Sequence, residues 1–295
     1  MTEWTLAGSP SSFSSGRAGL AAGASAAFAG GLCWLHPNVS GGFHWAGGSS
    51  LGKSALLYSA ASLCGPAAYR KTWLLTATAI EGVAAGHCDT PLLLDELKQA
   101  GNPRDVAQAA YMLTSGQGKG RGQAAGGLRE TSSFSLLFQS NGEIGLTQFL
   151  EENQERAYAG QEVRFCELPA DAGAGFGCWD VLHGLADGAR FSETLQRNAA
   201  KHYGVAYPEF IRRVIGEREA MPAQFEALRR AFEALQARLA AEGLFDDEIR
   251  VHGQYLLDAD SVLDGEAGDD RQGVTPHAGN RHYVCLDSGA TGRIG

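Results

Sequence analysis

The sequence predicts an α/β protein in which a parallel five-stranded sheet is flanked by helices, followed by a helical region and an irregular C-terminal tail. Up to about residue 170, short apolar runs alternate with segments of helical periodicity. Such alternation is typical of parallel strands that are covered by helices on both faces. A glycine-rich loop lies between the first apolar run and the helix that follows it. From residue 171 onward the pattern is mostly helical, and after residue 244 the periodicity is lost.

Five apolar runs are expected to form the strands of the sheet. The first is aromatic and leads into the glycine-rich loop, and the third is continuously apolar and ends in two carboxylates. The fourth ends in a polar Ser-Asn-Gly-Glu sequence. Continuous apolar runs of this length suit strands that are buried on both faces. The expected strands are residues 43–46, 72–77, 91–94, 134–139 and 163–168.

Helical periodicity and helix-ending residues delimit the segments between the strands. Gly65-Pro66 ends the helix after the glycine-rich loop, and Pro103 stands at a first-turn position. These helices are expected at residues 18–35, 55–64, 78–87, 103–115 and 147–155, and three more at 191–203, 209–217 and 222–242. The last helix carries an apolar stripe, typical of a core or packing face, made of Phe225, Leu228, Phe232, Leu235 and Leu239.

The composition divides the chain into four segments. Residues 1–17 are rich in Ser and Gly and form a loose lead-in, and residues 18–170 form the core with the alternating pattern. Residues 171–244 are a helical extension, and residues 245–295 are an irregular acidic tail. The formal net charge is −9, which excludes a protein that coats nucleic acid through bulk positive charge but leaves room for a local basic loop.

The sequence favours a cytoplasmic protein without a membrane partner. No run of 18 apolar residues is present, and the N-terminus lacks the basic start and apolar core of a signal peptide. The six cysteines form no CxxC pair, so we expect them to be small apolar residues in a reducing compartment.

Residues 47–54 match the pattern G-x-x-x-x-G-K-[ST], the phosphate-binding loop of P-loop NTPases. Glycines let backbone N–H groups wrap phosphates without an intervening Cβ atom. Lys53 is expected to reach the β- and γ-phosphates, and the Ser54 hydroxyl to ligate Mg²⁺. The alternative is a glycine turn without function, but the strand before and the helix after favour ATP or GTP binding. The expected nucleotide-binding residues are Gly47, Gly48, Ser49, Ser50, Leu51, Gly52, Lys53 and Ser54.

Two carboxylates, Asp95 and Glu96, directly follow the apolar run of residues 91–94. A carboxylate at the end of a buried parallel strand emerges beside the phosphate-binding loop. Asp95 is expected to hold Mg²⁺ through water, and Glu96 to orient and deprotonate the attacking water. The alternative is an exposed acidic pair at a strand end.

Asn141 follows the fourth apolar run and is expected to contact the γ-phosphate or the attacking water. The alternative is an ordinary Asn-Gly turn formed with Gly142. The order of the elements favours the functional interpretation. An extra strand, residues 72–77, lies between the phosphate-binding loop and the strand that ends in the two carboxylates, and the strand that ends at Asn141 follows. This order belongs to ATPases that carry an additional catalytic glutamate.

The basic residues that are candidates for a function fall into two groups. Arg156 and Arg164 are candidates for the arginine that stabilises phosphoryl transfer, often from a neighbouring subunit, although surface ion pairs are the commoner fate of such residues. Lys119 and Arg121 belong to a loop with glycine at every second position, which suits contact with a nucleic-acid backbone in a ring pore. That loop could equally bind phosphate locally or be solvated.

These motifs together resemble the bacterial and phage family called domain of unknown function 927, whose members are regarded as helicase-like ATPases of mobile elements. The resemblance covers roughly residues 18–242. It rests on Gly41-Gly42-Phe43-His44, Ser49-Ser50-Leu51-Gly52-Lys53-Ser54, Ala60-Ala61-Ser62, Thr72-Trp73, Thr76-Ala77-Thr78, Glu81, Leu94-Asp95-Glu96, Ala110-Tyr111-Met112-Leu113, Gly116-Gln117-Gly118-Lys119, Ser140-Asn141-Gly142-Glu143 and Ala159-Gly160-Gln161-Glu162-Val163-Arg164.

The resemblance implies ATP at residues 47–54, Mg²⁺ near Ser54 and Asp95, Glu96 as catalytic base and Asn141 as sensor. It also makes Arg164 the better arginine candidate. Longer relatives carry more sequence before this core and further helical sequence after it, so a truncated copy is expected.

Three functions remain open on this basis. The leading hypothesis is a Mg·ATP-dependent, helicase-like motor that moves a single nucleic-acid strand through a homo-oligomeric ring. The alternatives are a regulatory nucleotide switch that never translocates and an inactive pseudo-ATPase.

Overall fold

The computed structural model describes residues 17–35, 40–122, 127–129, 131–155 and 164–241. A parallel five-stranded sheet forms its centre, in the order β2-β3-β6-β1-β7. The strands are β1 (Ser40–Ala46), β2 (Lys71–Thr72), β3 (Pro91–Asp95), β6 (Leu136–Gly142) and β7 (Phe165–Pro169). The mixed α/β class and the five parallel strands expected from the sequence are therefore confirmed.

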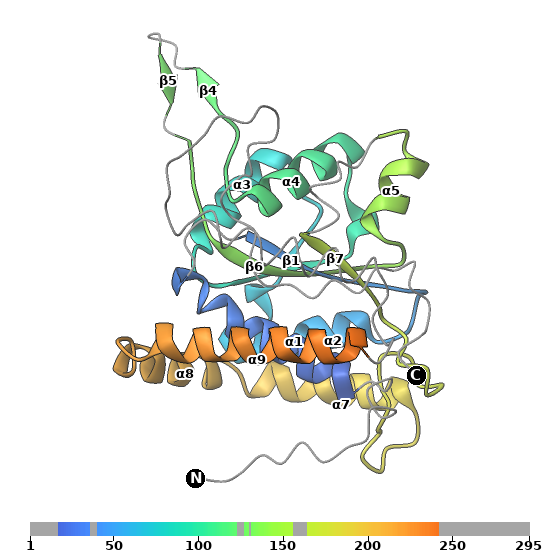
Figure 1. The fold of residues 1–295 in the computed structure, drawn as a ribbon. Coiled ribbons are helices and arrows are strands. Elements are labelled where there is room, and N and C mark those ends of the chain that lie inside the picture. Colours follow the sequence, from blue (N-terminus) through green and yellow to red (C-terminus); the bar gives the residue numbers. More distant parts are fainter. Residues whose placement is uncertain (1–16, 36–39, 123–126, 130, 156–163, 242–295) are drawn as a thin grey trace.

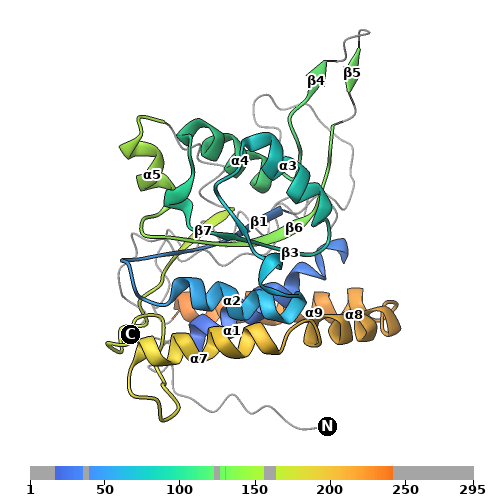
Figure 2. The same cartoon turned by 180° about the vertical axis from the view of Figure 1, so that it is seen from behind.

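Helices cover both faces of the sheet (Figures 1 and 2). One face carries α3 (Ala77–Gly86), α4 (Pro103–Ser115) and α5 (Leu146–Glu152), and the other carries α1 (Arg17–Gly30) and α2 (Lys53–Cys64). On the same side of the sheet as α1 and α2 lie α7 (Gly188–Lys201), α8 (Ala206–Gly216) and α9 (Met221–Ala241). Short 3-10 helices are η2 (Cys33–Leu35), η3 (Ala67–Tyr69) and η4 (Leu97–Gln99), and a two-stranded ribbon is made of β4 (Arg121–Gly122) and β5 (Leu128–Arg129).

The strand expected at residues 72–77 is much shorter in the structure, where β2 is Lys71–Thr72. The reason is the start of α3, because the Thr76 side chain accepts a hydrogen bond from the backbone N–H of Ala79 at 3.2 Å. A threonine in this capping position ends the extended chain and begins a helix. The ribbon of β4 and β5 is not predicted by the sequence either, since its glycines carry no strand pattern.

The central strands are buried along their whole length, which explains their apolar composition. Every residue of β3 and of β6 is buried. Gly42 of β1 is required by close packing, because a Cβ atom there would lie 2.2 Å from the carbonyl oxygen of Phe138 on β6. The sheet therefore fixes the positions of the three strand ends that matter below, those of β1, β3 and β6.

The helical extension after residue 170 shares a core with the segment before it. Trp179 and Phe191 are buried in one cluster with Trp45 of β1 and Leu56 of α2. The backbone N–H of Ala170 donates to the carbonyl of Ala46 at 2.7 Å. The predicted lead-in (residues 1–17) and tail (residues 245–295) lie, apart from Arg17, outside the described residues.

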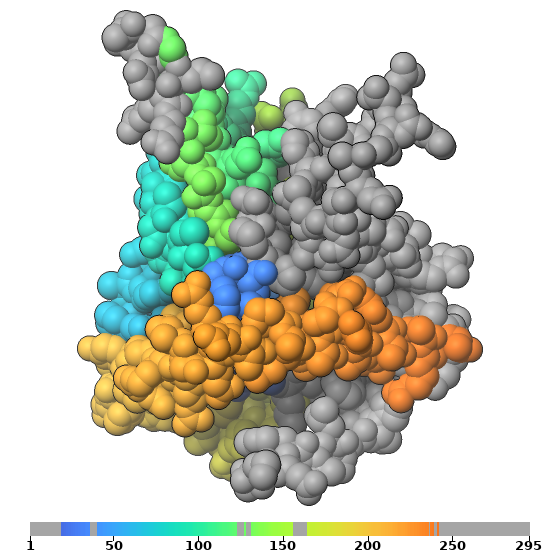
Figure 3. Space-filling model, turned by 60° about the vertical axis from the view of Figure 1, so that its left-hand side comes forward, coloured from blue at the N-terminus to red at the C-terminus, as the bar shows by residue number. Residues whose placement is uncertain are grey.

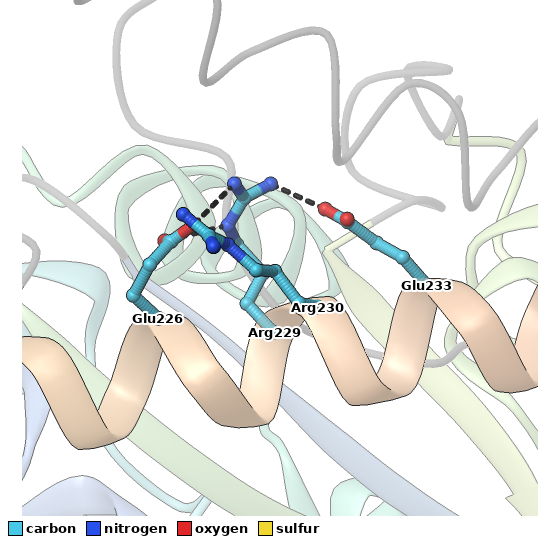
Figure 4. Close-up of polar contacts among 4 residues, drawn as sticks. All are labelled: Glu226, Arg229, Arg230 and Glu233. Carbon is cyan, nitrogen blue, oxygen red and sulfur yellow. Dashed lines mark hydrogen bonds and ion pairs between the residues drawn. The ribbon is translucent and has the colours of Figure 1, made fainter.

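Three of the five residues in the apolar stripe of α9 are exposed, contrary to the prediction of a packing face. Leu228, Phe232 and Leu235 are 69%, 38% and 41% exposed. Figure 3 shows α9 lying along the outside of the molecule. The helix carries ion pairs within itself, from Arg229 to Glu226 and Glu233 and from Arg230 to Glu226 (Figure 4). Pairs three and four residues apart stabilise the helix on its own surface.

None of the described helices combines the length and the apolar character that crossing a bilayer requires.

A hydrogen-bonded network fixes His44 in the core of the sheet. The His44 Nε2 atom lies 3.0 Å from the carbonyl oxygen of Ile144, and Nδ1 lies 3.0 Å from the Ser140 hydroxyl. The indole N–H of Trp73 donates to that same hydroxyl at 2.7 Å. One assignment satisfies all three groups: Nε2 carries the proton, and Ser140 donates to Nδ1. The ring is completely buried, and burial lowers its pKa to about 4.

We expect His44 to make the fold sensitive to mild acid. Between pH 6.5 and about 4, His44 is protonated in the unfolded chain but stays neutral in the folded protein. The free energy of unfolding therefore falls as the pH falls. The loss attributable to this ring is about 2 kcal/mol by pH 5. Urea unfolding of the wild type and His44→Gln at pH 7 and pH 5 measures it. The difference in unfolding free energy between the wild type and His44→Gln should be smaller at pH 5 than at pH 7. An equal difference at both pH values would contradict a lowered pKa of His44.

Candidate functional site

The carboxyl ends of β1, β3 and β6 meet the N-terminus of α2 at one edge of the sheet, and a pocket of about 360 Å³ opens there. Most of the residues predicted to bind nucleotide line it, together with Glu96. Three groups of residues form the lining: 49–55 from the loop and the start of α2, Glu96 and Glu143 from the loops after β3 and β6, and Ala189, Ser192, Glu193 and Gln196 from α7. Gly47 and Gly48, which are also predicted to bind nucleotide, are not among the lining residues, but their carbonyl oxygens contact Lys53.

Lys53 reaches back over the loop that precedes it. Its Nζ atom donates to the carbonyl oxygens of Gly47 and Gly48 at 2.7 and 2.6 Å. The side chain is buried, with 6% of the residue exposed. The structure thus places the positive charge inside the loop, beside the N-terminus of α2. A helix N-terminus and a fixed ammonium group both favour a bound anion at this place.

Gly52 ends the loop in a conformation that favours glycine. Its φ is 101°, in the left-handed region, and α2 starts at the next residue. A Cβ atom there would lie 2.8 Å from the Trp179 ring and 2.9 Å from the Ser192 hydroxyl. Trp179 donates to that hydroxyl at 2.9 Å, so the segment after residue 170 forms a wall behind the loop.

Replacing Gly52 with Ala should destabilise the fold by about 3 kcal/mol, because left-handed strain and steric overlap act together. Gly48→Ala is the matched control, since a Cβ atom at Gly48 meets nothing within 4 Å. Thermal unfolding without nucleotide measures both. Equal stability of the two variants would mean that Gly52 is not held as the structure shows.

Asp95 stands at the centre of the polar contacts at this edge. Its Oδ1 atom accepts hydrogen bonds from the Ser54 hydroxyl at 3.3 Å and from the Asn141 side-chain amide at 2.8 Å. Its Oδ2 atom forms an ion pair with Arg70 Nη1 at 2.8 Å. The two residues predicted to hold Mg²⁺, Ser54 and Asp95, are therefore adjacent.

Asn141 links Asp95 to Glu96. While its amide N–H₂ donates to Asp95, its Oδ1 atom accepts from the backbone N–H of Glu96 at 2.7 Å. Asn141 is completely buried, and both ends of its amide are used. The predicted sensor is thus a residue that fixes the two acidic groups relative to each other.

Glu96 has a strained backbone, with φ 58° and ψ 81°. Non-glycine residues in this region are uncommon and persist where surrounding contacts hold them. Here the contact is the hydrogen bond from the Glu96 N–H to Asn141. It directs the chain so that Glu96 lines the pocket opposite the loop of residues 49–54.

The donors at this edge fit a magnesium–nucleotide complex better than a metal held by protein alone. No group of three His, Cys, Asp or Glu side chains that could hold a metal occurs among the described residues. Mg²⁺ bound with a nucleotide takes one or two protein oxygens and fills its other positions with phosphates and water. Ser54 and Asp95 supply such a pair.

Arg164 lies away from the pocket of its own chain. It immediately precedes β7, at the amino edge of the sheet, and its Nη1 atom donates to the carbonyl of Thr114 at 3.2 Å. Thr114 belongs to the last turn of α4, where a positive charge is favourable. Arg164 as an arginine finger toward a neighbouring subunit stays a prediction. The other candidate, Arg156, lies outside the described residues.

Lys119 and Arg121 differ in their surroundings. Arg121 forms a bidentate ion pair with Glu81, at 2.7 and 3.1 Å, and Glu81 is buried. Its guanidinium thus anchors the ribbon of β4 and β5 to α3. Lys119, by contrast, is exposed to solvent.

Sequence reasoning missed two parts of the site. Arg70 carried no motif, and its ion pair with Asp95 arises because β2 places it beside the end of β3. The contribution of α7 was also missed, since an amphipathic helix far along the chain gives no signal of what its polar side faces.

The comparisons with known proteins concern the family resemblance and the fold. The model of the family described as "Domain of unknown function (DUF927)" matches residues 11–133. No curated protein matches the chain. Among solved structures, one described as "SCCmec type IV Cch - active helicase" is similar, with a TM-score of 0.50 and 20% identity over 75% of this chain and 37% of that chain. At this identity the likeness shows the fold alone, and the chain spans little more than a third of that helicase.

The family match agrees, over residues 11–133, with the resemblance that the motifs predict: this part of the chain is similar to the domain of unknown function 927 family.

Proposed function

We propose that the chain is a P-loop ATPase that hydrolyses ATP with Mg²⁺ as part of a helicase-like nucleic-acid motor of a phage or mobile genetic element. One observation carries the proposal. A single network joins Ser54, Asp95, Asn141 and the backbone of Glu96 at the edge of a pocket that the phosphate-binding loop lines.

Each residue has a distinct task in this proposal. Lys53 and the backbone N–H groups at the start of α2 bind the phosphates. Ser54 and Asp95 hold Mg²⁺, which supplies charge stabilisation to the transferring phosphoryl group. Glu96 accepts the proton of the attacking water. Asn141 fixes the positions of Glu96 and Asp95 relative to each other.

The motor part of the proposal draws support from the fold and from Lys119. The similar solved structure is described as an active helicase, and the likeness extends over three quarters of this chain. Lys119 is exposed at the base of the β4–β5 ribbon, where it can meet a phosphate backbone. The nucleic acid is proposed to be single-stranded, and the assembly a homo-oligomeric ring in which Arg164 or another arginine serves the neighbouring site.

A non-translocating nucleotide switch is the second candidate. The observation that favours it is the ion pair of Arg121. Because this guanidinium binds Glu81 and Thr78, it is not free to bind a nucleic-acid backbone.

The ATPase rate with and without single-stranded DNA at low salt separates the two candidates, together with a strand-displacement assay. A motor shows stimulation by DNA and strand displacement, whereas ATP hydrolysis without nucleic-acid affinity identifies the switch. Bound ATP without hydrolysis identifies an inactive pseudo-ATPase.

Lys119→Gln should weaken DNA binding and reduce the slope of log affinity against log salt by about 1, as expected for one lost phosphate contact. Lys201→Gln, at the exposed end of α7, is the matched control and should leave the slope unchanged. Equal slopes for Lys119→Gln and the wild type would mean that Lys119 does not contact the DNA.

A further inference from the structure

The Arg70 guanidinium lies between an aromatic ring and the carboxylate that is proposed to hold the metal. Its Nη1 atom is 2.8 Å from Asp95 Oδ2, and its Cζ atom is 4.4 Å from the centre of the Tyr58 ring on α2. The side chains of Arg70 and Asp95 are only 21% and 12% exposed. A guanidinium that is stacked on a ring and partly withdrawn from water holds a carboxylate more firmly than an exposed ion pair does.

The chain on both sides of Arg70 is attached to β3. On one side, the Tyr69 hydroxyl donates to the carbonyl of Pro91 at 2.8 Å. On the other side, the backbone N–H of Trp73 donates to the carbonyl of Asp95 at 3.1 Å. The fold itself, rather than a chance side-chain rotamer, therefore brings Arg70 to Asp95.

The two oxygens of Asp95 have different partners. Ser54 and Asn141 donate to Oδ1, and Arg70 neutralises the charge at Oδ2. A metal ion that binds Asp95 meets a carboxylate whose charge is already balanced. Because two cations beside one carboxylate repel each other, binding the metal opposes the Arg70 pair.

We propose that Arg70 is an internal counter-ion of Asp95 that competes with Mg²⁺ and so sets the Mg²⁺ concentration at which the pocket binds nucleotide. This inference rests on the proposed function. Arg70 acts through Asp95 and is a positioning residue. Its effect is to hold the acidic edge of the pocket neutral until metal and nucleotide arrive together.

Binding of a fluorescent ATP analogue, measured across a series of Mg²⁺ concentrations and in EDTA, tests the inference. In Arg70→Gln the Mg²⁺ midpoint, the Mg²⁺ concentration that gives half-maximal binding of the analogue, should fall about fivefold, the size expected for loss of one partly buried ion pair. The affinity for the analogue in EDTA should stay within about twofold of that of the wild type. Lys71→Gln is the matched control, because it removes the adjacent positive charge, which contacts the carbonyl of Ala68 and not Asp95.

Each other outcome has a defined meaning. An unchanged midpoint in Arg70→Gln, with normal nucleotide binding by the wild type, overturns the inference and leaves the proposed function standing. A loss of affinity in EDTA also overturns it, because Arg70 would then bind phosphate directly. A wild type that binds no nucleotide contradicts the proposed function itself. If Arg70→Gln does not fold, Tyr58→Leu removes the ring that holds Arg70 and should lower the midpoint about twofold.

Discussion

Glu96→Gln is expected to bind ATP as the wild type does and to lose hydrolysis by about two to three orders of magnitude. A glutamine has the shape of the glutamate but cannot accept the proton of the attacking water, and general-base catalysis contributes about 10²- to 10⁴-fold. The backbone of Glu96 keeps its hydrogen bond to Asn141, so the geometry of the pocket is retained. Release of inorganic phosphate under saturating ATP measures turnover, and equilibrium binding measures affinity.

Glu143→Gln is the matched control for this prediction. Glu143 also lines the pocket, but it is paired with Lys98 at 3.0 Å, and that pair lowers its pKa. Glu143 follows β6 rather than the acidic strand, so its replacement should leave turnover within about threefold of the wild type, the range of a surface ion pair. Equal losses in both variants would show that negative charge in the pocket matters and not the position of Glu96.

Asn141→Leu is expected to have the second-largest effect, on stability and turnover together. Leucine fills a similar volume, but it leaves a carboxylate oxygen of Asp95 and the N–H of Glu96 without their buried partner. Two such losses in a fully buried position should cost about 2 to 4 kcal/mol of unfolding free energy. Urea unfolding measures the cost, and phosphate release measures the accompanying loss of hydrolysis.

Asn141→Asp separates the two roles of the amide. It retains an acceptor for the N–H of Glu96 but places a second carboxylate beside Asp95, so its loss of stability relative to the wild type should be smaller at pH 5, where a proton can be shared, than at pH 8. The same difference in unfolding free energy from the wild type at both pH values would mean that residue 141 does not contact Asp95.

The parallel sheet and the phosphate-binding loop could be predicted because local patterns encode them. Runs such as residues 91–94 have no polar face, so burial on both sides follows from composition. The loop of residues 47–54 is a contiguous motif, and the acidic pair at residues 95 and 96 lies at the end of a strand whose place in the sheet the chain order indicates.

The rest of the site depends on contacts between residues that are distant in sequence. The role of Asn141 as a link depends on β6 lying beside β3, and the ion pair of Arg70 depends on the register of the short strand β2. Arg121 shows the converse, because its basic, glycine-rich surroundings favoured a nucleic-acid contact, while the fold brings it to the buried Glu81. Glu81 lies forty residues earlier on α3, and no local pattern relates the two.

Binding of Mg·ATP to the wild type and to Lys53→Ala by isothermal titration calorimetry tests the central claim most directly, with Lys201→Ala, at the exposed end of α7, as the control for charge. We expect saturable binding by the wild type and Lys201→Ala, and a loss of at least about tenfold in Lys53→Ala, because one buried ammonium group serves the phosphates. Equal affinity in Lys53→Ala, or no saturable binding by the folded wild type, would contradict the assignment of residues 47–54 as a nucleotide site.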